Sequence, residues 1–410
     1  MKRLDINSLI PGLVVGDHVR TPSGQILAPT GTVLTQQLIN RMKLYRITQV
    51  TIKESTDAPF VSDDSIDGEK INIPVSNNVV SQVKITQENV AQTKNIQTTT
   101  NESATPSQKA APTHAEKSIT HSQKVAASDD FKDFQMQYFS AIEKLKLVFS
   151  AATDKNQQID TTDLLNSVSS LFTSRNTIIE LFDMLYNMRI VKDSVYAHSL
   201  NTGLISRMIG RWLKMDKHDL DVLTLSGLLH DIGKTQIPDS ILNKPGKLTD
   251  QEFALIKQHP KLGYDILKNQ NLDPHIKKSA LMHHERCDGS GYPSGLEEDF
   301  IDEYAMIVGI ADVYDAMTTA RSYRAPLCPF QVISNFEEEG FQKYNTKYIL
   351  TFLQQIAATY QSNRVILNDG RGCNIVMLNQ TALSKPMVQL DDSSIIDLSS
   401  QRDLYIKAVL

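Results

Sequence analysis

Cysteine is scarce in this sequence of 410 residues, and what there is does not form a pattern. The three cysteines, Cys287, Cys328 and Cys373, are far apart and odd in number. This spacing excludes a disulfide framework and a CxxC zinc site. It is typical of proteins that work in a reducing compartment.

Long apolar runs are missing as well. No uninterrupted stretch approaches the roughly 18 apolar residues of a membrane span. The N-terminal stretch MKRLDINSLIPGLVV is short and is broken by Asp5, Asn7 and Pro11, so it does not resemble a signal peptide. A net charge of −5 lacks the basic excess of a general nucleic-acid binder. The composition therefore predicts a soluble, cytoplasmic protein without general nucleic-acid binding or a membrane span.

Aromatic residues are absent from one long internal segment. Between Val61 and Asp130 there is no Phe, Trp or Tyr, and Thr, Ser, Gln, Asn and Lys are frequent. Such a segment cannot bury enough apolar surface to offset its ordering entropy. We interpret residues 56–130 as a flexible low-complexity linker, with a partner-binding tail as the alternative.

The linker separates parts with different patterns. Residues 1–55 carry β-branched runs between Pro-Ser-Gly and Pro-Thr-Gly turns, then a helical pattern over residues 34–45, and they predict a small α+β module. Residues 131–360 have apolar residues at helical spacing and predict a helical domain. Residues 361–410 contain strand-like runs, two of which meet at Asp369-Gly370, and they predict a small β-rich extension. The expected fold class is therefore mainly α.

Histidines are distributed unevenly. Seven of the ten lie between His198 and His284. A lone histidine is more often an ordinary core or surface residue than a ligand. We interpret five histidines in this way: His18, His114, His121, His218 and His275.

The remaining histidines form a set of candidate metal ligands with two acids. The apolar stretch LLHDIGK carries one adjacent pair, and a second pair opens HHERCDGSGYPSGL. Asp312 lies in the apolar stretch IVGIADVYDAM, where a buried carboxylate is costly unless it is paired or metal-bound. Imidazole and carboxylate ligands suit Fe, Mn, Zn, Ni or Co and disfavour a thiolate site. The set predicts a binuclear site in a helical bundle, with these ligands: His198, His230, Asp231, His259, His283, His284 and Asp312.

A loop and two arginines could bind an anionic substrate. The glycines of HHERCDGSGYPSGL allow unusual backbone angles that expose N–H groups, and Pro293 stiffens the turn. A polar loop after a helix is the alternative. Arg321 and Arg324 lie within about three helical turns of Asp312. They suit a phosphate substrate, or else they are helix-end cations that pair with nearby acids.

Five stretches in order resemble the HD-GYP domain, a branch of the HD metallophosphohydrolases. The resemblance covers about residues 194–360 and rests on HSLNTGLISRMIG, LLHDIGK, LNKPGKLTDQEFALIKQHPKLGYDIL, HHERCDGSGYPSGL and GIADVYDAMTTARSYR. It implies a helical bundle around two or three divalent metals, often iron or manganese. It also implies hydrolysis of the bacterial second messenger cyclic di-GMP to pGpG or GMP. The N-terminal module and the β-rich tail resemble domains that accompany this family.

The resemblance implies a role for each matching residue. The seven candidate ligands fall on the family's metal positions, and Asp231 and Lys234 would act in catalysis with a hydroxide that bridges two metals. The implied substrate-binding residues are Gly291, Tyr292, Pro293, Asp315, Arg321 and Arg324.

Two positions depart from the family pattern. Ser194 stands where members with a third metal carry a glutamate, so we expect two metals. Cys287 stands where an aromatic residue is frequent, which could change the pocket wall or place a redox-sensitive thiol beside the metals.

Other interpretations stay open at this point. One is an HD-type hydrolase of another nucleotide, and another is a non-catalytic cyclic di-GMP receptor or protein-docking module. A homodimer through residues 131–190 is an alternative to packing of these helices within one chain, and signalling-protein partners are conceivable.

Overall fold

The fold is that of a computed structural model, which describes residues 1–20, 26–35, 38–39, 42, 47–53, 121–154, 157–172, 178–188, 194–319 and 326–410. The chain divides into two compact units, Met1–Lys117 and Ser118–Leu410. Most of the expected linker lies outside the described residues. Its last ten residues do not form a linker, because residues 121–130 lie in α2 (His121–Ala127) and at the start of α3 (Asp129–Asp154).

The first unit contains short antiparallel strand pairs. Strand β1 (Lys2–Asp5) pairs with β4 (Gln49–Ile52), and β2 (Val19–Arg20) pairs with β3 (Ile26–Ala28). Buried Val15, Met42 and Ile52 belong to a separate apolar core. The helix expected over residues 34–45 falls largely outside the described residues.

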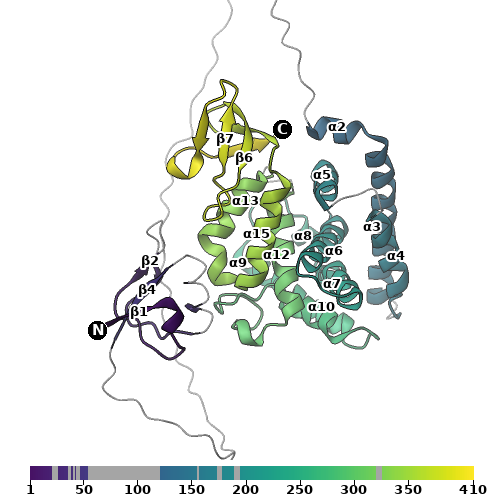
Figure 1. The fold of residues 1–410 in the computed structure, drawn as a ribbon. Helices are drawn as coiled ribbons and strands as arrows, with labels where there is room; N and C mark the ends of the chain where they lie inside the picture. The colour runs from purple at the N-terminus through teal and green to yellow at the C-terminus, as the bar shows by residue number, and fades with distance from the viewer. Residues whose placement is uncertain are drawn as a thin grey trace, which may run out of the picture. The chain divides into compact units, whose positions relative to one another are not determined.

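The second unit is mainly helical (Figure 1). Its longer helices are α3, α4 (Thr161–Leu171), α5 (Ile178–Met188), α6 (Val195–Trp212), α7 (Lys217–Leu229), α10 (His259–Leu267), α11 (Pro274–Met282), α12 (Glu303–Thr318) and α15 (Thr346–Thr359). Shorter ones are α8 (Asp239–Leu242), α9 (Asp250–Ile256), α13 (Pro329–Asn335), α14 (Phe341–Lys343), the 3-10 helices η2 (Ile232–Gln236) and η3 (Glu298–Phe300), and the π-helix η4 (Phe336–Gly340). None of the helices in the described part of the chain combines the length and hydrophobicity of a membrane-spanning segment.

Helix α12 lies in the middle of this bundle and packs against α6, α7 and α11. Its sequence is apolar nearly all round, as expected of a helix that is buried on most sides. Ile310 and Ala311 are completely buried, and Asp312 follows them directly. The sequence therefore places a carboxylate inside the core, where it must find cationic or metal partners.

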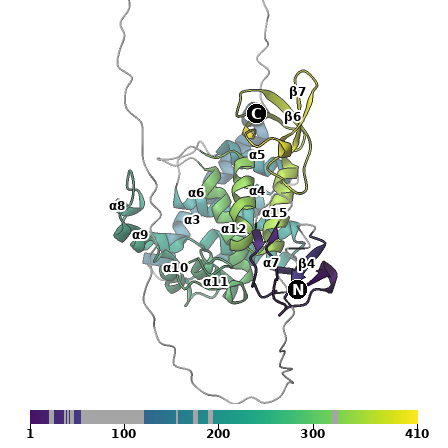
Figure 2. The same ribbon diagram turned by 90° about the vertical axis from the view of Figure 1, so that its left-hand side faces the viewer.

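A five-stranded antiparallel sheet follows the last helix and lies at one end of the bundle, next to α13 (Figures 1 and 2). The strand order is β8-β7-β6-β5-β9, and the strands are β5 (Arg364–Leu367), β6 (Gly372–Met377), β7 (Met387–Leu390), β8 (Ile395–Asp397) and β9 (Ile406–Val409). Gly370, with a φ of 92°, lies in the turn between β5 and β6. The expected mainly α fold with a small β-rich C-terminal region is confirmed.

The sheet region is anchored to the bundle by the partly buried side chain of Glu337 on η4. Its carboxylate accepts hydrogen bonds from the backbone N–H of Leu383 at 2.5 Å and of Ser384 at 3.3 Å. The hydroxyl of Ser384 donates to the same carboxylate at 2.5 Å. One side chain thus satisfies three donors that lie more than 40 residues away.

We expect Glu337→Ala to destabilise the second unit by about 2 kcal/mol, because buried donors that lose a charged acceptor keep their desolvation cost. Thermal unfolding of the full chain measures this effect. The matched control is Glu338→Ala, which removes an exposed carboxylate from the neighbouring position. Equal shifts of the two unfolding temperatures would contradict the anchoring role.

Candidate metal centre

The seven candidate ligands converge although they come from different helices. His198 lies on α6 and Asp312 on α12, while His259 is the first residue of α10. The others lie at or next to the ends of α7 and α11. All except His284 are buried, and the His284 side chain is 16% exposed. The full set is His198, His230, Asp231, His259, His283, His284 and Asp312.

Three of the histidines have their ring orientation fixed by the backbone. The Nδ1 atoms of His230, His259 and His283 lie 2.7, 2.8 and 3.0 Å from carbonyl oxygens three or four residues earlier in the chain. Each Nδ1 therefore carries the proton and donates it, which leaves the lone pair on Nε2. Such a bond on one ring nitrogen is how proteins orient metal-binding histidines.

The Asp231 carboxylate lies between two groups of imidazoles. Its Oδ1 atom is 3.2 Å from His259 Nε2 and 3.8 Å from His283 Nε2. Its Oδ2 atom is 3.3 Å from His230 Nε2 and 3.6 Å from His198 Nε2. Each carboxylate oxygen thus faces a different set of ring nitrogens.

Asp312 spans the same space from the opposite helix. Its Oδ1 atom is 2.9 Å from His198 Nε2 and 4.0 Å from His230 Nε2, and its Oδ2 atom is 3.7 Å from His284 Nδ1. The ligand atoms form compact groups within 4.8 Å, among them His259, His283 and His284 on one side, and His198, His230 and Asp312 on the other.

Two imidazoles of the centre, those of His283 and His284, are kept neutral beside ionised carboxylates. Burial, together with the neighbouring histidines, holds the pKa of His283 well below its usual range. Burial also lowers the pKa of His284 well below its usual range. Burial alone would raise the pKa of Asp231, but the neighbouring His230 and Lys234 side chains outweigh it and hold this pKa well below normal. These are the protonation states that metal binding requires.

Several buried atoms in the centre face groups with which they cannot bond. Among the described residues, His230 Nε2 and Asp231 Oδ1 have no hydrogen-bond partner, although both side chains are fully buried. The Nε2 atoms of His259 and His283 face each other at 3.1 Å, and both rings already donate through Nδ1. Lone pairs directed at one another are unfavourable unless a cation lies between them. The residues therefore fit divalent metal ions.

The segment after Asp231 brings a cation and a close contact to the centre. The Lys234 ammonium donates to Asp231 Oδ2, and the Lys234 side chain remains partly exposed. Gly233 packs against α10, where an added Cβ would lie 2.0 Å from the carbonyl oxygen of His259. Glycine at this position lets α10 approach close enough for His259 to reach Asp231.

The Gly291-Tyr292-Pro293 loop packs directly on the ligands. A Cβ at Gly291 would lie 2.6 Å from the carbonyl oxygen of His284, and the Tyr292 ring stacks on the His284 ring with centroids 4.6 Å apart. The buried carboxylate of Glu285 holds the loop by accepting from the N–H of Ser294 at 2.7 Å and of Leu296 at 2.9 Å. Sequence reasoning missed Glu285, although an acid inside HHERCDGSGYP was the available signal.

Asp315 lies behind His198 instead of facing the open side of the centre. Its Oδ2 atom accepts from His198 Nδ1 at 2.7 Å, and its Oδ1 atom accepts from Asn201 Nδ2 at 2.9 Å. Burial opposes the charge on His198, but hydrogen bonds to Asp312 and Asp315 raise the pKa of His198 to about 10. Asp315 is therefore placed to orient the metal ligand His198. This role fits its position better than the substrate-binding role expected from the sequence.

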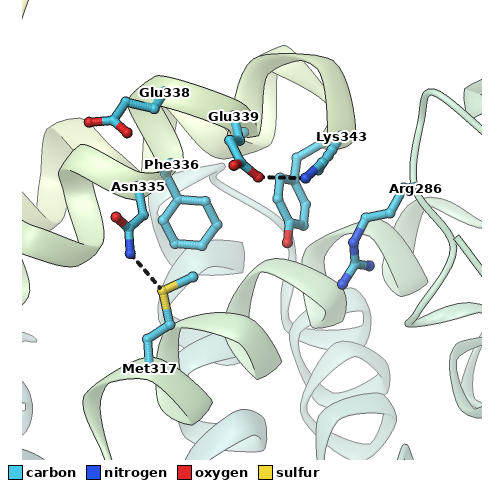
Figure 3. Close-up of a pocket in the computed structure, with 9 residues that line it drawn as sticks. Arg286, Met317, Asn335, Phe336, Glu338, Glu339 and Lys343 are labelled. Carbon is cyan, nitrogen blue, oxygen red and sulfur yellow. Dashed lines mark hydrogen bonds and ion pairs between the residues drawn. The ribbon is translucent and has the colours of Figure 1, made fainter. Parts of the chain in front are cut away.

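The structure has a cavity of about 490 Å³, and one of its lining residues is Arg286, which follows the second histidine pair by two positions in the sequence (Figure 3). The Arg286 guanidinium lies 5.0 Å from the centre of the Tyr344 ring and donates to the carbonyl oxygen of His283 at 3.1 Å. Lys343 forms an ion pair of 2.6 Å with Glu339. The described lining residues are Arg286, Met317, Asn335, Phe336, Glu338, Glu339, Gly340, Lys343 and Tyr344.

The other sequence expectations have separate outcomes. Arg321 and Arg324 lie outside the described residues. Ser194 is the N-cap of α6, and its hydroxyl accepts from the N–H of Ala197 at 3.1 Å. Burial raises the pKa of Cys287 to about 12, which counts against a reactive thiolate.

Two of the histidines interpreted as ordinary residues, His18 and His275, have partners away from the metal centre. His275 bonds to Asp302 at 2.8 Å, and His18 accepts from the N–H of Thr30 at 2.9 Å. His114 lies outside the described residues.

Comparison with known proteins identifies similar domains of the HD type. Residues 161–347 match the HD domain family. The chain is 38% identical over 173 residues to a cyclic di-GMP phosphodiesterase of Pseudomonas aeruginosa. The matched residues make up 41% of this chain and 41% of the relative. It is 36% identical over 180 residues to a cyclic di-GMP phosphodiesterase of Thermotoga maritima, covering 43% of this chain and 48% of the relative.

A third relative is named for a different substrate. The chain is 32% identical over 201 residues to the 3'3'-cGAMP-specific phosphodiesterase 2 of Vibrio cholerae, covering 46% of this chain and 38% of the relative. The chain thus spans less than half the length of each of these three relatives. Residues 161–347 of this chain therefore carry an HD-type domain that is similar to domains of cyclic di-GMP phosphodiesterases.

Proposed function

We propose that this chain is a metal-dependent phosphodiesterase that hydrolyses cyclic di-GMP to pGpG, GMP or both. The observation that carries the proposal is the Asp231 carboxylate, with each oxygen directed at a different group of buried imidazole nitrogens. This geometry suits two divalent ions that share one carboxylate, with iron or manganese as the expected metals. The relatives of Pseudomonas aeruginosa and Thermotoga maritima support the choice of substrate.

The chain's own residues then have distinct roles in the proposed reaction. Two bound ions would supply a water of lowered pKa and neutralise charge on the phosphodiester. Lys234 holds a proton on Nζ at the partly exposed edge of the centre, where it can reach the leaving 3'-oxygen. Tyr292 covers His284 and limits the access of bulk water from that side.

The cavity lined by Arg286 provides room for the part of the substrate that does not react. Its volume of about 490 Å³ is within the range of small-molecule sites. Arg286 brings a cation to its wall, which suits the second phosphate of a cyclic dinucleotide, whereas Lys343 is paired with Glu339. Arg321 and Arg324 remain candidates for the same role from sequence.

A second candidate substrate is 3'3'-cGAMP, because the relative of Vibrio cholerae acts on it according to its name. The two cyclic dinucleotides differ in one base and share the phosphodiester chemistry. A non-catalytic receptor is less compatible with the complete set of buried ligands, because binding alone does not need them.

We expect the chain, purified without oxygen, to contain about two Fe or Mn ions and to release pGpG or GMP from cyclic di-GMP. Metal analysis and chromatography of the same sample measure both. A parallel panel with 3'3'-cGAMP, (p)ppGpp and a mononucleotide defines the substrate. Metal without turnover of any of these compounds would contradict an enzymatic function, and faster turnover of another compound would replace the proposed substrate.

Asp231→Ala should abolish metal loading and hydrolysis together, because it removes the carboxylate that both groups of imidazoles face. Lys234→Ala should retain the metal and lower kcat by about 10²-fold, since it removes one proton donor. Metal content and kcat of each purified variant measure the two effects.

The chain offers a matched control for both variants. Lys268 and Asp265 form an exposed pair of 2.9 Å with the same three-residue spacing as Lys234 and Asp231. Lys268→Ala and Asp265→Ala should leave metal content and kcat unchanged. Full activity of metal-loaded Asp231→Ala would refute the assignment of this residue.

Glu285→Gln should lower kcat/KM by about tenfold with metal content unchanged, because its amide N–H₂ replaces an oxygen that accepts a loop N–H. Steady-state kinetics with cyclic di-GMP measure this change. Asp288→Asn is the control, since Asp288 is an acid of the same loop that bonds only locally to Ser290 among the described contacts. Wild-type kinetics in Glu285→Gln would show that the loop does not need this anchor.

A further inference from the structure

A chain of hydrogen bonds leads from the metal centre into helix α3. His198 Nδ1 bonds to Asp315 Oδ2 at 2.7 Å, and Asp315 Oδ1 accepts from Asn201 Nδ2 at 2.9 Å. Asn201 Oδ1 in turn accepts from the Tyr138 hydroxyl at 2.7 Å. This series of hydrogen bonds therefore joins residues of α6, α12 and α3 in one network.

The network has a single consistent direction. Asn201 must present its N–H₂ group to the Asp315 carboxylate, because the opposite orientation would set two oxygens against each other. That orientation turns Oδ1 towards Tyr138, whose hydroxyl can donate to it. A weaker contact of 3.5 Å links the same hydroxyl to the carbonyl oxygen of Ala197.

All members of the network are shielded from water. Tyr138 is 2% exposed, Asp315 3%, and His198 and Asn201 7% each. Water therefore cannot easily replace a lost bond. The described alternative partners are at longer distances: the Thr319 hydroxyl lies 3.3 Å from Asp315 Oδ1, and the carbonyl oxygen of Ala197 lies 3.5 Å from the Tyr138 hydroxyl. A carboxylate with both oxygens engaged also has little freedom to rotate, so it fixes the plane of the His198 ring.

Tyr138 lies outside the stretch that matches the HD domain family, which begins at residue 161. Helix α3 packs against α6, and the Tyr138 ring lies 5.9 Å from the Phe134 ring. Apolar packing alone would be served equally well by phenylalanine. The hydroxyl is what connects α3 to the ligand network.

We propose that Tyr138 and Asn201 are positioning residues of the metal centre and that α3 is a functional part of it. Through Asp315 they hold the His198 ring so that Nε2 points to the same place as Asp312 Oδ1. The inference rests on the metal centre of the proposed function but not on the identity of the substrate. It implies that a displacement of α3 along α6 changes the orientation of a metal ligand.

The test compares Tyr138→Phe with Tyr304→Phe in the full-length chain. Tyr304 is a buried tyrosine on α12 whose hydroxyl donates to Asp219 at 2.9 Å, and none of its described contacts involves the metal ligands. Both variants lose one hydroxyl bonded to an oxygen. The readouts are the dissociation constants for Co²⁺ and Mn²⁺ from chelator competition, the visible spectrum of the Co²⁺ protein, and kcat with KM.

We expect Tyr138→Phe to weaken metal binding by about three- to tenfold, because changes to residues that support ligands typically cost ten- to a hundredfold and Tyr138 acts one bond further away. It should also shift the Co²⁺ spectrum and lower kcat more than it changes KM. Tyr304→Phe should lower the unfolding temperature without any of these effects. Identical metal affinities and spectra for Tyr138→Phe and the wild type would overturn the proposal.

A second variant removes the middle of the network. Asn201→Ala should weaken metal binding by at least as much as Tyr138→Phe, and the double variant should be no weaker than Asn201→Ala, because both act through one bond chain. If the losses of metal affinity in the two single variants instead add up in the double variant, Tyr138 and Asn201 do not act through the same series of hydrogen bonds. Failure of the wild type to hydrolyse cyclic di-GMP would refute only the proposed substrate, since metal affinity and spectrum still report on Tyr138. Failure to bind any metal would overturn both proposals.

Discussion

The buried Asp231 carboxylate is the constraint on which the second unit depends. A fully buried ionised group is expensive, and its cost must be offset by neighbours of fixed position. Imidazoles from two helices, α6 and α10, and from the ends of two others, α7 and α11, surround it, and Lys234 bonds to one of its oxygens. The relative placement of α6, α7, α10 and α11 therefore cannot change freely, because each one brings a nitrogen to the same carboxylate. The close backbone contact at Gly233 and the apolar surroundings of Asp312 follow from the same requirement.

Much of this centre could be predicted from the sequence because the signals were chemical and local. Adjacent ligand pairs next to apolar helical runs are hard to explain unless the helices end at a common site. The carboxyl group of Asp312 within a continuous apolar stretch predicted burial, and the structure places it between His198 and His284. The spacing of apolar residues likewise predicted the helical unit, and the Asp369-Gly370 turn predicted the first two strands of the final sheet.

The rest depended on partners that no local pattern reveals. Tyr138 occupies an apolar position of an amphipathic helix, and its hydroxyl partner is 63 residues away. Periodicity shows that such a residue is buried but cannot show which atom its hydroxyl meets. Asp315 was expected from the sequence to bind substrate, and only the fold shows that it lies behind His198. The early start of the helical unit at His121 was missed because the short helix HSQKVAA has nearly the same composition as the polar segment before it.

The ligands also lie far apart along the chain, and this spacing sets the order of events during synthesis. Asp312 is 114 residues beyond His198, so a ribosome must make most of the helical unit before the last ligand exists. The complete set of candidate ligands for a metal exists only once Asp312 has been made. Because borderline imidazole and carboxylate sites discriminate weakly among divalent ions, the ion that such a site acquires reflects the metals that the surrounding compartment makes available.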